Sequence, residues 1–466
     1  MKIRWTAVIL ILAATLSSLP AAWGLELTVE GDCLSVRAQN VPLGEILRHL
    51  SRAGVQVSAP PGLHQRVSAD FRNKTMHEGL GTILKPYGYV LFWEREGDDA
   101  SLRLSEMHVF DPGGSSGAWS GAGEEFALSR DPRDGSLYIQ NEILVRASPG
   151  ADQQLIQETI AGVGGVILEK NETLGIYRAR LPESIDIPGF LEMLKTKETR
   201  FSAETNRAYP IDFPRWSPTI PPGLENRQDA VAVRPDMAAP VAVFDSGLLG
   251  GYGLEESVIA SLDAVQPGMP VTDGLGHGTQ MAMVAAGAVR PAGAGEGSSR
   301  AAPIIPVRAF DDNGVTSNFA IMKGIDFAVQ NGARVVSMSW GSETPSPFLE
   351  AAMNYADQQG LILVASAGNE PTGKPVYPAA YSSVLGVGAL APDGTPWKQS
   401  NHGSFVSVSA PGYAAFPVGY RGEAGLYAGT SIAAAYVANI ISGWLTENPH
   451  WQKADVVDHL QTQSFK

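Results

Sequence analysis

The sequence predicts an α/β fold with a parallel sheet in its C-terminal half, preceded by two small α+β domains. After residue 238, segments with strand and helix patterns alternate along the chain. The strand segments there are continuous runs of Val, Ile, Leu and Ala, which is typical of a parallel sheet covered by helices on both faces. Before residue 210 the strands are short, alternate with polar residues and are interrupted by short amphipathic helices.

Composition and charge argue against several classes of partner and site. The chain has 466 residues, of which 44% are hydrophobic, enough to form the cores of several domains. It carries 34 basic and 48 acidic residues, and this net charge of −14 argues against nucleic acid or an anionic membrane surface as a partner. A single cysteine excludes a disulfide within the chain, and scattered histidines offer no zinc cluster.

The first 24 residues have the pattern of a secretory signal peptide. Lys2 and Arg4 precede an apolar run at 7–16, and small residues at 22–24 supply a cleavage site. The alternative is an uncleaved membrane anchor, but the apolar run is shorter than the roughly 20 residues that span a bilayer. No later stretch is apolar enough to cross a membrane. We therefore expect an exported protein with no transmembrane helix after signal cleavage.

Residues 25–108 are expected to form the first small domain. Its predicted strands and helices are strands 34–38, 55–57, 67–71 and 89–93, and helices 41–53 and 76–84. This order, with the sequence Ala-Gln-Asn-Val-Pro-Leu at 38–43, resembles the secretin and TonB short N-terminal domain. The resemblance implies a module that binds a protein partner of the cell envelope. A linker rich in Gly and Ser is expected at 109–136.

Residues 137–209 are expected to form the second small domain, of ferredoxin-like βαββαβ order. Its predicted strands and helices are strands 142–147, 165–169, 175–181 and 200–205, and helices 151–163 and 187–194. The proline-rich segment 210–235 is then expected to be an exposed, extended linker suited to cleavage.

Residues 236–466 are expected to form the α/β domain. Its predicted strands are 241–244, 304–309, 335–340, 362–366 and 384–388, and its predicted helices are 278–286, 318–330, 347–359 and 430–445. In such sheets ligands bind at the carboxyl ends of the strands.

Three residues in this domain form a catalytic pattern. Asp245 ends a buried strand, His277 follows a glycine loop at a helix start, and Ser431 lies where a Gly-Thr turn enters an Ala-rich helix. Singly, they would be a turn residue, a helix-start histidine and a helix cap. Together they match a nucleophilic serine, a histidine base and an orienting aspartate, in the chain order known from subtilisin.

With these motifs, residues from about 236 to 446 resemble the catalytic domain of subtilisin-like serine proteases (subtilases). The resemblance implies an endopeptidase that acts on proteins and peptides through an acyl-enzyme, with a three-layer fold and no required cofactor. It implies that Asn369 supplies the oxyanion hole. It also implies that the substrate lies between two short segments, Ser339, Trp340 and Gly341 on one side and Ser366, Ala367 and Gly368 on the other. Because 400–403 and 409–412 match a further family segment, His402 is expected to be structural. We infer a preference for an apolar residue before the cleaved bond.

The second small domain is similar to the propeptides that precede subtilase catalytic domains, at 142–146, 174–177 and 203–206. The resemblance implies an intramolecular chaperone and inhibitor, and hence an autoprocessed zymogen. The chain departs from the family at Ala435, where proline is usual, and at 280–283, where Gln-Met-Ala-Met replaces His-Val-Ala-Gly. Neither change removes a proposed catalytic residue.

Several questions stay open at this point. The acidic loop 311–313 is compatible with structural calcium or with an ordinary turn, so no metal residue is assigned. A second hypothesis is a catalytically weak or silent subtilase fold whose N-terminal module docks it to an envelope assembly. An esterase with a Gly-x-Ser-x-Gly elbow is excluded by the surroundings of Ser431. The sequence leaves open the substrate, cleavage specificity, maturation site, fate of the N-terminal domain and oligomeric state. It also leaves open whether the exported protein stays in the periplasm or reaches the outside medium. The first domain favours a diderm bacterium as the source.

Overall fold

The computed structural model describes residues 25–30, 33–58, 65–84, 88–95, 102–110, 127–148, 154–197, 200–217, 238–295, 299–419 and 424–462. The predicted signal peptide, residues 111–126 of the predicted linker and residues 218–237 lie outside these ranges.

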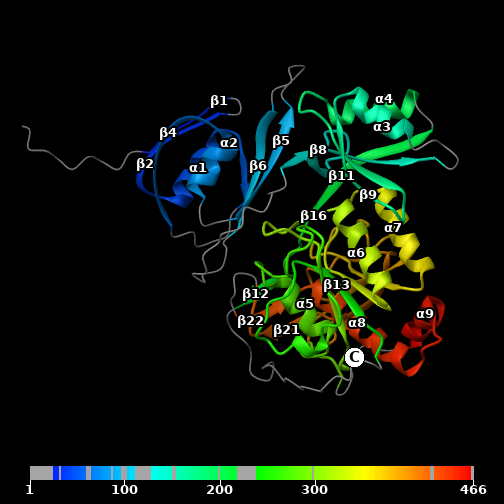
Figure 1. The fold of residues 1–466 in the computed structure, drawn as a ribbon. Coiled ribbons are helices and arrows are strands. Elements are labelled where there is room, and N and C mark those ends of the chain that lie inside the picture. Colours follow the sequence, from blue (N-terminus) through cyan, green and yellow to red (C-terminus); the bar gives the residue numbers. More distant parts are fainter. Residues whose placement is uncertain are drawn as a thin grey trace, which may run out of the picture.

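The first domain has its own small core (blue in Figure 1). Its antiparallel sheet has the order β1-β2-β4, with β1 (Glu26–Glu30), β2 (Cys33–Pro42) and β4 (Arg66–Thr75). Two helices contact this sheet, α1 (Leu43–Arg52) and α2 (Met76–Ile83). Helix α1 buries Leu43, Ile46, Leu47 and Leu50 on one stripe, the 3.6-residue spacing from which it was predicted.

The second domain has the element order βαββαβ. It consists of β8 (Leu137–Ala147), α3 (Gln154–Gly162), β9 (Val166–Asn171), β10 (Ile176–Arg180), α4 (Ile187–Lys197) and β11 (Phe201–Pro210). The strands lie in the order β11-β8-β10-β9, and all neighbours are antiparallel. Ile143, Tyr177 and Leu191 belong to a core of its own.

One sheet connects all three parts of the chain. Strand β7 (Leu128–Arg130) pairs with β8 on one side and with β5 (Gly88–Arg95) on the other. Beyond β5 lie β6 (Leu102–Phe110) and β3 (Gln56–Ser58), and β11 pairs at the opposite end with β16 (Val315–Ser317). Strand β7 lies inside the segment expected to be a linker, so the part of that linker from 127 onward is ordered, with Leu128 buried.

The third domain contains a seven-stranded, all-parallel sheet, which confirms the predicted fold class. Its order is β14-β15-β13-β17-β18-β19-β20, with β14 (Leu262–Asp263), β15 (Ile304–Arg308), β13 (Val241–Asp245), β17 (Val335–Met338), β18 (Ile362–Ser366), β19 (Val384–Leu390) and β20 (Val406–Pro411). The helices are α5 (His277–Ala285), α6 (Asn318–Gln330), α7 (Pro347–Gln358), α8 (Thr430–Glu447) and α9 (Lys453–Thr462). A small antiparallel sheet, β12 (Arg215–Ser217), β22 (Gly425–Ala428) and β21 (Tyr413–Phe416), lies beside it.

The sheet is covered on both faces, as its continuous apolar strands require. On β13, Val241 and Val243 belong to the core that contains α5 and α8, whereas Ala242 and Phe244 belong to the core that contains α6 and α7. Successive side chains therefore point to opposite helical layers. The hydrophobic packing on both faces holds the strand ends that carry the site residues.

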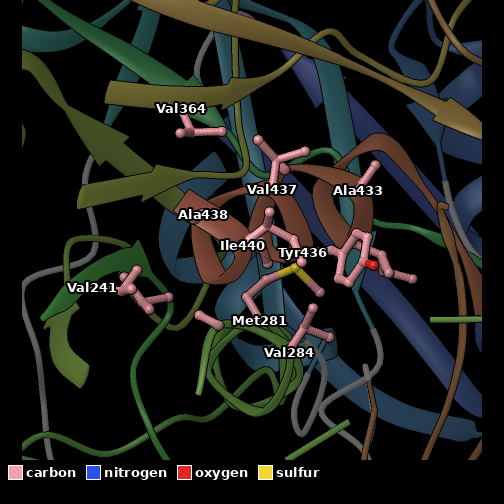
Figure 2. Packing of buried hydrophobic residues seen from close by; sticks show 14 of the residues in the cluster. Val241, Met281, Val284, Val364, Ala433, Tyr436, Val437, Ala438 and Ile440 are labelled. Atoms are coloured by element: carbon pink, nitrogen blue, oxygen red, sulfur yellow. The ribbon is translucent and has the colours of Figure 1, made fainter. Parts of the chain in front are cut away.

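The unusual residues on α5 fit into the layer between α5 and α8. Figure 2 shows Met281 pointing toward Tyr436 on α8. Met281 and Met283 are both buried, and Gln280 donates its side-chain amide to the Val418 carbonyl at 2.9 Å. Helix α8 continues through Ala435 without interruption. The departures from the family pattern are thus absorbed in the packing behind the site.

Candidate active site

The candidate residues meet at the carboxyl end of the parallel sheet. Asp245 is the last residue of β13, His277 is the first residue of α5, and Ser431 lies in the first turn of α8. Asn369 follows the end of β18. All four side chains are at most 2% exposed, so the site is closed to solvent in this state.

Asp245 orients the ring of His277. The Nδ1 atom of His277 lies 2.6 Å from Oδ1 of Asp245, and the Ser246 amide donates to the same oxygen at 2.8 Å. Gly276 supplies the turn before the helix with a φ of 77°, and a side chain there would lie 2.3 Å from the Gly419 carbonyl oxygen. The bond at Nδ1 leaves Nε2 as the ring atom available for proton transfer.

The proton-transfer atoms are buried and have no hydrogen bond in the described part of the chain. This holds for Nε2 of His277 and for Oγ of Ser431. Buried polar atoms normally have a hydrogen-bond partner, and those that lack one near an active site often act on a ligand. The hydrogen bond that would join the two is therefore not formed in this state.

Negative charge around His277 favours its protonated form. Burial by itself lowers the pKa of His277, but the charge and hydrogen bond of Asp245 oppose this effect. The charges of Asp273 and Asp212 act in the same direction, and the net result is a pKa above the ordinary value of 6.5. An imidazolium formed during a reaction would be stabilised here.

Asp273 holds the loop before His277 in place, a role that the sequence motifs did not reveal. Its carboxylate accepts the Ser246 hydroxyl at 2.8 Å and the Thr279 hydroxyl at 2.6 Å. It also accepts the backbone N–H groups of Leu275, Gly276 and Thr279. An aspartate four residues before a helix start is the signal that could have identified it, because carboxylates there satisfy free N–H groups.

Asn369 is fixed by Thr430, the residue before the serine. Its Oδ1 atom accepts the Thr430 N–H at 2.9 Å and the Thr430 hydroxyl at 3.0 Å. The orientation of the amide is therefore determined, and its Nδ2 atom points at the Asp212 carbonyl oxygen, 3.4 Å away. An N–H donor is thus presented to a peptide carbonyl next to Ser431.

The two expected substrate-binding segments flank this point. Ser339, Trp340 and Gly341 follow β17, and Trp340 forms an antiparallel bridge with Ile211. Gly341 has no room for a side chain, because a Cβ atom would lie 2.3 Å from a methyl group of Val376. On the other side, Ser366, Ala367 and Gly368 lead from β18 to Asn369, and the Gly368 N–H donates to the Thr430 hydroxyl at 3.2 Å.

The start of the expected cleavable linker is not an exposed segment. Strand β11 extends to Pro210, and Ile211 and Pro214 are buried. The chain then continues as β12 beside β22, the strand that leads into α8. The prediction of an exposed linker is therefore wrong for 211–214, whereas Pro210, Arg215 and Trp216 are exposed. The cause is tertiary pairing with the third domain, which sequence patterns do not report.

Among the described residues no group of three or more His, Cys, Asp or Glu side chains is arranged to hold a metal ion. In the acidic loop, Asp311 accepts the N–H groups of Asn313 and Val315 at 3.0 and 2.9 Å, which is the geometry of a turn. No helix in the described part of the chain is long and apolar enough to cross a membrane.

The third domain is similar to known proteins. The profile of the Subtilase family matches residues 240–464. Thermitase from Thermoactinomyces vulgaris is 32% identical over 206 residues, which cover 43% of this chain and 73% of that protein. Subtilisin Savinase from Lederbergia lenta is 33% identical over 225 residues, 47% of this chain and 81% of that protein. The crystal structure of fervidolysin from Fervidobacterium pennivorans has a similar fold (TM-score 0.59, 24% identity, 73% of this chain and 59% of that chain).

Proposed function

Because this chain belongs to the subtilase family of serine proteases, we propose that Asp245, His277 and Ser431 are its catalytic residues. The protein is a subtilisin-like serine endopeptidase that acts on protein substrates. The observation that carries the assignment is the 2.6 Å contact between His277 and Asp245, with the serine at the start of the neighbouring buried helix. The alternation of parallel strands and helices brings the end of β13 and the starts of α5 and α8 together at the carboxyl edge of the sheet.

In the proposed reaction, Ser431 attacks the carbonyl carbon of a peptide bond while Nε2 of His277 takes its proton. Asp245 keeps the ring in the tautomer with hydrogen on Nδ1 and stabilises the charged form. Nδ2 of Asn369 and the backbone N–H of Ser431 stabilise the oxyanion. His277 then protonates the departing amine, and water releases the acyl group by the same steps in reverse.

The second domain is proposed to be the propeptide that inhibits the enzyme and is removed by self-cleavage. Its βαββαβ order and its tight contacts with the third domain support this role. Arg178 lies over the ring of Phe319 on α6, and Lys323 pairs with Glu169 at 3.0 Å. These contacts bind the domain to helix α6.

The first domain is proposed to be a secretin-like module that binds an envelope protein, in an enzyme exported to the periplasm or beyond. The signal-peptide pattern at residues 1–24 supports export. The pairing of β5 with β7 makes this domain an extension of the propeptide sheet. We therefore propose that the first and second domains leave the enzyme as one piece. No cofactor is proposed.

A serine-directed fluorophosphonate tests the proposed nucleophile. It reacts only with a serine that is activated by a base, so we expect one label per processed molecule, on the peptide that contains Ser431. Mass spectrometry of the labelled, digested protein identifies the site. A Ser442→Ala variant, which removes a different buried serine on the same helix, should be labelled as well as the wild type. Folded protein whose N-terminal part has been removed by another protease, and which takes no label on Ser431, would support the silent subtilase fold instead.

Replacing Asp273 with asparagine tests its role in positioning His277. The amide would place N–H donors against N–H groups, so we expect a stability loss of about 1–3 kcal/mol. We also expect kcat to fall roughly tenfold with little change in KM, because a misplaced base affects the transition state more than binding. Asp263→Asn is the matched control: this buried aspartate pairs with Arg308 at 2.8 Å and should change stability alone. Equal kcat values for both variants would contradict the positioning role.

A further inference from the structure

Residues 208–217, called the crossing segment here, lie across the active site as a bound peptide would. Residues 208–210 pair antiparallel with β16, and Ile211 forms the next bridge, with Trp340. The Ile211 N–H also donates to the Gly314 carbonyl at 2.8 Å. After the site, residues 215–217 pair antiparallel with β22. Pairing through the backbone on both sides of the reacting groups is how an extended peptide is recognised by added strands.

Within this segment one peptide bond lies at the reacting groups. The Asp212 carbonyl oxygen is the acceptor for Nδ2 of Asn369, at 3.4 Å. The next residue, Phe213, places the edge of its ring against His277, with ring centroids 5.8 Å apart. The carbonyl that faces the oxyanion donor is the one that the serine attacks. The residue that follows that carbonyl carries the amine that the histidine protonates.

We propose that Ser431 cleaves this chain between Asp212 and Phe213, and that the enzyme accepts before the cleaved bond a short side chain with an oxygen acceptor. The proposal rests on the proposed function. The Oγ–carbonyl bond forms while His277 takes the proton, and the C–N bond breaks as that proton passes to the Phe213 amine. Water then hydrolyses the ester, which leaves Asp212 with a terminal carboxylate.

The Asp212 side chain is held by a backbone donor. Its Oδ2 atom accepts the Asn369 N–H at 2.8 Å, so the same asparagine residue contacts both the carbonyl and the carboxyl group of Asp212. Burial raises the pKa of this carboxyl group, and the nearby charge of Glu370 adds to the effect, while the Asn369 bonds and the charge of Arg215 oppose it. A neutral donor serves an aspartate or an asparagine side chain, whereas an apolar side chain would leave the buried N–H unpaired. The preference that we propose is therefore polar, in contrast to the apolar one expected from the sequence.

The first test locates the cut. The full chain is exported or refolded, and the earliest fragments are weighed intact over time, beside the Ser431→Ala variant. We expect a fragment that ends at Asp212 and a partner that begins at Phe213, with Ser431→Ala uncut. A first cut at another bond with Ser431→Ala still uncut would overturn the cleavage site and leave the proposed function standing. Equal trimming of both chains would overturn self-cleavage. The proposed function would then be decided by the label at Ser431.

The second test addresses the side chain before the bond. We expect Asp212→Asn to be cut within about threefold of the wild-type rate, and Asp212→Lys at least tenfold more slowly, because a lysine brings a second donor to the Asn369 N–H. Glu183→Lys is the matched control, since it makes the same charge change at an exposed position of the same domain and should not slow the cut.

Peptides tested in trans remove any effect on folding. The processed enzyme is given Ala-Tyr-Pro-Ile-X-Phe-Pro with X as Asp, Asn, Phe or Lys. We expect kcat/KM for Asp and Asn to exceed that for Phe by at least tenfold. Faster cleavage of the Phe peptide would overturn the proposed preference, whatever the site of self-cleavage.

Discussion

Replacing Ser431 with alanine is expected to lower kcat by about 10⁶-fold, the loss measured for subtilisin itself when its serine is removed. The physical reason is that no other group at this position can form the acyl-enzyme, while substrate binding and the Asn369 donor remain. Because the variant is also expected to stay uncut, with the crossing segment across its site, the comparison concerns the rate and not KM. Burst and steady-state kinetics on a peptide substrate measure the effect, and intact mass shows whether the chain stays uncut.

A control variant on the same helix separates chemistry from folding. Ser442 is also buried on α8, and its hydroxyl donates to the Ala239 carbonyl far from the site. Ser442→Ala should lower stability by about 1 kcal/mol and leave kcat unchanged. If Ser431→Ala retained more than a thousandth of the wild-type rate, a different nucleophile would have to act.

The α/β domain could be predicted because its local patterns and its tertiary structure agree. Strand 362–366 and helix 318–330 have the predicted bounds, since a fully buried parallel strand is apolar throughout and a helix start carries a cap such as Ser317. Strand β14 was not predicted, because its two residues are too few for any periodicity. The motifs around Asp245, His277 and Ser431 identified residues that the fold brings to one edge of the sheet.

The crossing segment could not be predicted from its own sequence. A proline-rich stretch normally predicts an exposed linker, and nothing local indicates that residues 208–210 pair with β16. That pairing depends on an edge formed by residues more than a hundred positions later. The role of Asp212 depends in turn on Asn369, which lies on another strand end. The fold determines which distant strands pair, and the local sequence pattern does not predict that pairing.

The contact between the second domain and helices α6 and α7 contains a carboxyl group that is unusually easy to protonate. Glu204 on β11 accepts the Ser346 hydroxyl at 2.5 Å and the Asn318 side-chain amide at 2.9 Å. Both partners lie at helix starts. Burial nevertheless dominates and raises the pKa of Glu204 from 4.5 to about 7, although these bonds and the charge of Arg207 oppose it.

Raising the pH should therefore weaken this contact. The native chain binds the Glu204 proton more tightly than the unfolded chain, so the contribution to stability is complete below pH 4.5 and is lost as pH rises to about 7. The loss amounts to about 3 kcal/mol, or roughly a few hundredfold in the equilibrium between the docked and released second domain. Once cut from the third domain, the second domain would leave more readily at neutral or alkaline pH than at pH 5.

Glu204→Gln, made in the uncut Ser431→Ala chain, isolates this effect because glutamine imitates the protonated acid. We expect denaturant unfolding to give equal stabilities with and without the change near pH 4.5. At pH 8 the glutamine variant should be the more stable by about 3 kcal/mol. Glu169→Gln, at the half-exposed ion pair with Lys323 on the same interface, should change stability by less than about 1 kcal/mol. A glutamine variant that is less stable than its parent at pH 8 would contradict the raised pKa of Glu204, because it would mean that the ionised carboxylate stabilises the two helix starts directly.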